Sequence, residues 1–95
     1  MKPTIAIILL LAFAACTTQI YVPSDANVNK RQTASLEELK QGHNLFGDKC
    51  GSCHKLPKPQ SFNSEQWTKI LEKMGPKAKL DKAQVDLVYK YVVNY

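Results

Sequence analysis

Cys50-Gly51-Ser52-Cys53-His54 lies near the middle of this 95-residue chain and constrains everything around it. Two thiols three residues apart, followed at once by an imidazole, form the pattern to which a c-type haem is covalently attached. On one helical turn both sulfurs can reach the two vinyl groups along one porphyrin edge, and the next side chain can present a nitrogen to the iron. The motif therefore predicts one covalent haem c, held by Cys50 and Cys53, with His54 as an iron ligand.

Three other interpretations of the two thiols remain open. A redox dithiol usually begins a helix after a strand, and no strand-rich pattern precedes this motif. A zinc site needs four ligands, which Cys50, Cys53, His54 and His43 could supply, although their spacing fits none of the usual templates. A structural disulfide is the third. Haem attachment is the interpretation that we favour over these three, because the Cys-X-X-Cys-His motif is specific.

The N-terminus has the pattern of an export signal. Lys2 precedes an apolar run over residues 5–15, which is shorter than the ~20 residues of a membrane span and fits a signal peptide over residues 1–15. Phe13-Ala14-Ala15-Cys16 resembles the lipobox of bacterial lipoproteins, in which the cysteine is lipidated and becomes the mature N-terminus. Cys16 is also the odd cysteine, which lipidation would account for; the alternative is ordinary cleavage nearby and an unmodified thiol. Thr17 after Cys16 resembles a sorting signal for the outer membrane.

Residues 16–34 are predicted to be the lipidated N-terminus and a flexible linker. They are mostly polar or small and show no sustained hydrophobic period. As a flexible coil the linker would span about 20 to 25 Å, and fully extended about 60 Å. The alternative is that Ile20, Tyr21 and Val22 dock on the domain.

Residues 35–95 are predicted to form one small all-α domain of about three helices. Capping boxes, in which side chains at a helix start satisfy backbone donors, mark helix starts at Ser35–Glu38 and Asp81–Gln84, and Asn63-Ser64-Glu65-Gln66 offers a further start with Asn63 or Ser64 as the cap. We expect the second helix to stop at Gly75-Pro76 and the third to reach about Asn94. Gly42 costs the first helix about 1 kcal/mol relative to Ala, which indicates that another backbone passes close by.

The second helix carries the candidate for the other iron ligand. Trp67, Ile70, Leu71 and Met74 share one face, so Met74 could simply be a core residue. It is also the only methionine outside the signal peptide, and Met/His ligation raises the reduction potential of a haem. His43 is the alternative sixth ligand, although we expect it to be a buried or half-buried core histidine.

The whole of residues 36–95 resembles a class I (monohaem) cytochrome c. The resemblance is carried by Gly42-x3-Phe46-x3-Cys50-x2-Cys53-His54, then Met74-Gly75-Pro76, then a terminal helix with Val88 and Tyr91. It implies that the first and last helices cross, with Gly42 and Phe46 against Val88 and Tyr91. It also implies His54 and Met74 as the iron ligands and a hydrogen bond from the Trp67 indole to a haem propionate. The sequence departs from that family by having only 19 residues between His54 and Met74.

The composition limits the partners. Thirteen Lys and Arg against eight Asp and Glu give a net charge of +5, but the single Arg31 argues against a nucleic-acid surface. Lysines flank the motif and the Met74 segment, and they could dock an acidic redox partner or be solvated surface. We therefore expect a lipid-anchored electron carrier on the periplasmic side of a bacterial membrane, and not an enzyme. The alternative is a haem-bearing subunit or small-ligand sensor of a larger redox complex.

Overall fold

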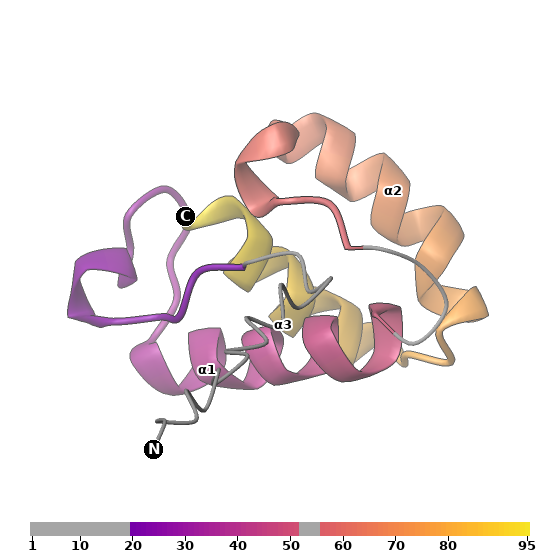
Figure 1. Ribbon diagram of the computed structural model, residues 1–95, viewed down its shortest axis with the longest axis horizontal. Helices are drawn as coiled ribbons and strands as arrows, with labels where there is room; N and C mark the ends of the chain where they lie inside the picture. Colours follow the sequence, from indigo (N-terminus) through magenta and orange to yellow (C-terminus); the bar gives the residue numbers. More distant parts are fainter. Residues whose placement is uncertain (1–19, 52–55) are drawn as a thin grey trace, which may run out of the picture.

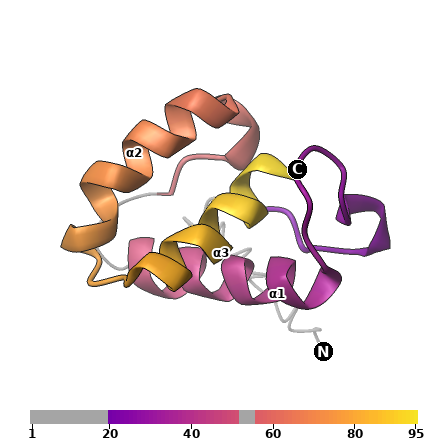
Figure 2. The ribbon, with the colours of Figure 1, turned by 180° about the vertical axis from the view of Figure 1, so that it is seen from behind.

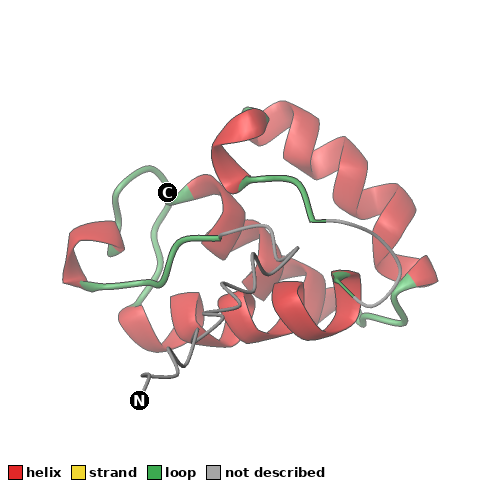
Figure 3. Cartoon of the chain, in the orientation of Figure 1, coloured by secondary structure: helices red, strands yellow, loops and turns green. Residues whose placement is uncertain are grey.

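A computed structural model describes residues 20–51 and 56–95. The predicted signal peptide, Cys16, Cys53 and His54 lie outside these residues. The elements follow the order η1 (Asp25–Asn27), α1 (Leu36–Leu45), η2 (Phe46–Cys50), η3 (Pro59–Ser61), α2 (Ser64–Lys77) and α3 (Lys82–Val93). The described residues form helices and loops without a strand, as Figure 3 shows, so the all-α prediction is confirmed.

Each α-helix begins at a capping box, as predicted for the first and third helices, and Asn63 is the cap of the second. The N-cap side chains of Ser35, Asn63 and Asp81 accept the backbone N–H three residues on, at 3.1, 2.8 and 2.8 Å. In return the Glu or Gln at that position accepts from the N-cap backbone. Such caps are worth about 1 kcal/mol each, so these short local sequences fix where the helices start.

The end of α2 differs from the prediction. The helix continues through Pro76 to Lys77, since a proline in the last turn gives up only one backbone hydrogen bond. The Gly75 carbonyl then accepts from Leu80 N–H at 2.9 Å, and the Pro76 carbonyl accepts from Lys79 N–H at 3.1 Å. This is a Schellman ending, and it places Lys79 in the left-handed region with a φ of 60°.

Helices α1 and α3 lie side by side in both views of the ribbon (Figures 1 and 2). They approach closest at Gly42, where an added Cβ would lie 2.1 Å from the Leu87 carbonyl oxygen and 2.7 Å from Tyr91 Cβ. The predicted close passage of another backbone at Gly42 is therefore confirmed. Phe46, one turn later, packs against the Tyr91 ring at a centroid distance of 5.9 Å.

The core lies between the three helices and is rich in aromatic residues. Its fully buried side chains include Leu39 from α1, Trp67 from α2, and Val88, Tyr91 and Val92 from α3. Burying such a side chain contributes about 1.5 to 3 kcal/mol. One cluster of buried residues joins Phe46 of η2 to the buried residues of α2 and α3.

Residues 20–34 do not form the flexible linker that we predicted. They pack on the C-terminal end of α3, and the alternative of a docked segment holds for Ile20 and Tyr21, while Val22 is exposed. The rings of Tyr21 and Tyr91 are stacked at 4.3 Å, and each phenol donates a hydrogen bond to the other residue's backbone carbonyl. Burial raises the pKa of both phenols above the ordinary tyrosine value, so both keep their donor hydrogen.

Asn94 holds the same segment from the other side. Its side chain is fully buried, and its Oδ1 accepts from the backbone N–H groups of Arg31 and Gln32 at 2.7 and 3.0 Å. Its Nδ2 donates to the Lys90 carbonyl at 2.7 Å, so the buried amide is satisfied on both ends. Hydrogen bonds from the backbone of the segment to the Asn94 side chain thereby tie it to the end of α3.

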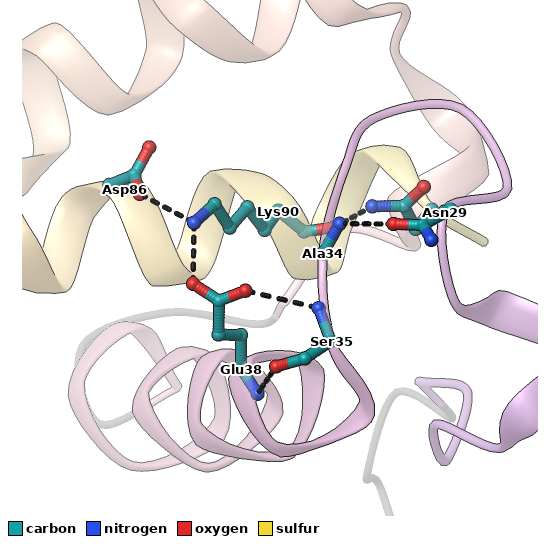
Figure 4. A network of polar contacts seen from close by, with 7 residues as sticks. Asn29, Ala34, Ser35, Glu38, Asp86 and Lys90 are labelled. Atoms are coloured by element: carbon teal, nitrogen blue, oxygen red, sulfur yellow. Dashed lines mark hydrogen bonds and ion pairs between the residues drawn. The ribbon is translucent and has the colours of Figure 1, made fainter.

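A surface ion pair joins α1 to α3 (Figure 4). Lys90 Nζ lies 2.6 Å from a Glu38 carboxylate oxygen and 3.2 Å from one of Asp86. The hydrogen bond from Lys90, followed by that from the Ser35 N–H, lowers the pKa of the Glu38 carboxyl. Hydrogen bonds to Glu38 and then to Asp86 raise the pKa of Lys90. Glu38 thus serves both the helix cap and the contact between the two helices.

Candidate functional site

An apolar cavity of about 500 Å³ lies against one face of α2 and opens to solvent. Its volume falls within the range of about 300 to 1,000 Å³ that is usual for cofactor and ligand sites. The residues that line it are Phe46, Cys50, Leu56, Pro57, Phe62, Trp67, Ile70, Leu71, Lys73, Met74 and Lys77. The site therefore draws on η2, the segment after the Cys-X-X-Cys-His motif, and α2.

The end of α1 brings Cys50 to this cavity. After Leu45 the helix widens into η2, one turn of π-helix from the buried Phe46 to the half-buried Cys50. Such turns are rare in proteins, and many of those that occur lie at functional sites. Gly51 closes the turn tightly, since a Cβ there would lie 2.5 Å from the Gly47 carbonyl oxygen. The sequence reasoning placed Cys50 on an ordinary helical turn and did not foresee the wider one.

Met74 lines the same cavity from α2. It is half-buried and lies one turn after Ile70 and Leu71, which line the cavity beside it. The structure thus brings Met74 and Cys50, two of the predicted site residues, to one apolar space. Cys53 and His54 lie outside the described residues, so iron ligation by His54 and Met74 stays a prediction.

Trp67 also borders the cavity, but its polar atom is engaged elsewhere. The indole N–H donates to the Pro59 carbonyl at 2.8 Å, and the side chain is almost fully buried. An indole has one donor, so this bond takes the hydrogen that the predicted contact with a haem propionate requires. The physical reason lies in the loop: Pro57 and Pro59 prevent a regular α-helix there. The Lys58 carbonyl accepts from the Ser61 N–H at 2.9 Å, and Trp67 supplies the donor for the Pro59 carbonyl.

Phe62 is a cavity residue that the sequence reasoning missed. Its ring meets Trp67 edge-on at 5.3 Å, and Phe46 meets the same indole edge-on at 5.8 Å. The available signal was its position directly before the Asn63 N-cap, where an apolar residue often packs back on its own helix. The three rings together form a rigid apolar wall.

His43 lies away from this wall. It is half-buried and meets Tyr91 edge-on at 5.3 Å, and the described residues that line the cavity do not include it. The prediction of a half-buried core histidine is therefore confirmed. This position gives His43 no access to the cavity from which it could act as the alternative iron ligand.

The second half of the chain matches a known family. Residues 46–95 fit the sequence profile described as dihaem cytochrome c. The chain belongs to this dihaem cytochrome c family. No curated protein and no solved structure shows a significant match. Membership establishes a c-type cytochrome, and with it electron transfer by a haem protein.

The family corrects our count of cofactors. We predicted one covalent haem, and the family is described as binding two. That count rested on the number of attachment motifs, and this chain contains one Cys-X-X-Cys-His sequence, at residues 50–54. A motif count reports attachment sites within one sequence, and therefore did not reveal a second haem.

The cavity has the chemistry that a haem requires. Its walls are aliphatic and aromatic, which suits a flat apolar macrocycle, and Cys50 of the attachment motif borders it directly. Met74 supplies a thioether side chain on the α2 wall.

No helix within residues 20–51 or 56–95 has the length and apolar character needed to cross a membrane.

Proposed function

We propose that this cytochrome is a one-electron carrier in which a haem is attached at Cys50 and Cys53, with its iron bound by His54 and Met74. The observation that carries the proposal is that Cys50 and Met74 line one apolar cavity. When bound there, the haem supplies one-electron redox chemistry through its iron. The protein supplies attachment, orientation and control of solvent access.

The described residues have separate roles in this proposal. Trp67, Phe46 and Phe62 form an aromatic wall that keeps water from one side of the cavity and cannot rearrange easily, because the Trp67–Pro59 hydrogen bond fixes it. Met74 as a thioether ligand would favour the reduced iron and raise the potential. A low-dielectric wall acts in the same direction, because it disfavours the more highly charged oxidised state.

The Met74 assignment is tested with Met74→Leu, which keeps the volume and removes the sulfur. The oxidised wild-type protein should show the weak far-red charge-transfer band of iron–sulfur ligation. The variant should lose this band, and its reduced form should bind carbon monoxide readily. Ile70→Leu, a change of shape on the same wall, is the matched control and should keep the band. A wild-type protein that lacks the band and binds carbon monoxide would contradict Met74 ligation.

We also propose that the protein is exported and lipidated at Cys16, on the periplasmic side of a bacterial membrane. Because residues 20–34 are docked on the domain, only residues 17–19 separate a lipid at Cys16 from the folded part. The four peptide steps from Cys16 to Ile20 span at most about 14 Å. This reach is shorter than the one expected of a free linker. A redox partner would therefore have to meet the protein close to the membrane surface.

Lipidation is tested by intact-mass measurement and membrane fractionation. The mature wild type should begin at Cys16, carry the mass of acyl chains and sediment with membranes. Cys16→Ala should abolish both the added mass and the sedimentation while leaving the haem spectrum unchanged. Wild-type protein found entirely in the soluble periplasmic fraction, without added lipid mass, would refute the anchor and leave electron transfer untouched.

The dihaem description also favours one alternative, a haem-bearing subunit that relays electrons to a neighbouring haem. A pyridine haemochrome assay, calibrated against amino-acid analysis, gives the number of haems per polypeptide. Redox titration then shows whether one or two potentials are present. Two interacting potentials in the purified protein would favour the relay over an independent carrier.

A further inference from the structure

The charged residues among the described lining of the cavity lie on one edge of α2. Of the described residues that line it, Lys73 and Lys77 alone are charged; they lie one turn apart and are both exposed. Neither forms an ion pair with another described residue. Their aliphatic stems border an apolar space while their ammonium groups can stay in water, as long cationic side chains commonly do. Two unpaired positive charges thus stand at the rim.

A haem needs partners for its two propionate carboxylates. Those groups lie on the porphyrin edge opposite the vinyl groups that react with cysteines, so a haem attached at Cys50 directs them away from η2. A carboxylate that is partly buried without a partner is costly, and a hydrogen-bonded cation is the strongest kind of compensation. Trp67 cannot supply a donor, because its N–H is bonded to the Pro59 carbonyl.

We propose that Lys73 and Lys77 bind the haem propionates, fix the orientation of the haem in the cavity and raise its reduction potential. The proposal rests on the proposed haem in this cavity, but not on iron ligation by Met74. The effect on potential follows from charge, since a lysine that neutralises a propionate removes negative charge that would stabilise the oxidised iron. Loss of either lysine should therefore lower the potential.

Helix α2 offers a matched control for the charge change. Lys69 is an exposed lysine of the same helix and is not among the cavity residues. Three variants each remove one positive charge: Lys73→Gln, Lys77→Gln and Lys69→Gln. Lys73→Arg keeps the positive charge at residue 73. The purified holoprotein of each variant is examined by spectroelectrochemistry and by resonance Raman spectroscopy of the propionate bending modes.

Lys73→Gln and Lys77→Gln should each lower the potential below that of Lys69→Gln and shift the propionate bands, and the double variant should do both to a larger extent. The Lys73→Arg variant should keep the wild-type bands. Equal potentials and unshifted bands in all three glutamine variants would overturn the proposal. If potentials and bands are unchanged but Lys73→Gln and Lys77→Gln weaken the salt dependence of electron transfer, the two lysines are instead assigned to docking of an acidic partner. Absence of haem in the pyridine haemochrome assay would refute the proposed function itself.

Discussion

Replacing Gly42 with alanine should break the contact between α1 and α3. An added Cβ would stand 2.1 Å from the Leu87 carbonyl oxygen, whereas real Cβ contacts are essentially never below 3.0 Å. The helices must therefore separate by about 1 Å at their crossing, and a backbone atom cannot rotate away as a side chain would. Overpacking of this kind costs about 1 to 3 kcal/mol, and we expect the upper end here. Alanine returns about 1 kcal/mol of helix propensity, so the net loss is about 2 kcal/mol.

Gly47→Ala is the internal control, because nothing lies within 4 Å of the Cβ that it would add. Thermal unfolding of both holoproteins, followed by far-UV circular dichroism and haem absorbance, measures the difference. For a domain of this size 1 kcal/mol shifts Tm by about 4 to 8 °C, so Gly42→Ala should melt about 10 °C below wild type. Gly47→Ala should melt at or above the wild-type temperature. Equal melting temperatures for the two variants would refute the steric argument.

Three further changes test other parts of the fold. Lys79→Gly should raise Tm because glycine relieves the left-handed φ of 60°, whereas Lys69→Gly, in the interior of α2, should lower it, because a helical glycine costs about 1 kcal/mol. Lys90 lowers the pKa of the Glu38 carboxyl, so this ion pair stabilises the fold at pH values above the ordinary glutamate pKa of about 4.3. The stabilisation is lost as the pH falls through the lower pKa of the folded state. Glu38→Gln should therefore flatten the acid side of the curve of stability against pH. Alanine at both motif cysteines should leave a largely unfolded protein by far-UV circular dichroism, and native helix content in that variant would contradict a structural role for the haem.

The helix starts could be predicted because a capping box is a local pattern. Ser35 and Glu38 satisfy each other's backbone within four residues, and the same holds at Asn63 and Asp81. The close approach at Gly42 could also be predicted, since a glycine inside a helix needs a reason. The end of α2 could not, because its left-handed residue is Lys79, and the usual glycine signal of a helix end is absent.

The docked N-terminal segment could not be predicted for a different reason. Its contacts are single side chains that meet the other end of the chain, and Tyr21 and Tyr91 are 70 positions apart. The polar composition of the segment resembles that of a linker, yet the Asn94 side chain accepts hydrogen bonds from the backbone N–H groups of Arg31 and Gln32. The hydrogen bond of the Trp67 indole could not be predicted for the same reason, because its partner is a loop carbonyl whose position no periodicity reveals.

The cavity divides the molecule into two parts that depend on the haem to different degrees. Helices α1 and α3 bury Leu39, Val88 and Val92 completely, and residues 20–34 are tied to the end of α3. Helix α2, by contrast, leaves Ile70 and Met74 half-buried at the cavity wall. Without a haem, the part of the cavity wall that Ile70 and Met74 form on α2 would face solvent, and apolar surface left in water costs about 25 cal/mol per Å². Loss of the haem should therefore release α2 first, while the α1–α3 contact is the last to open.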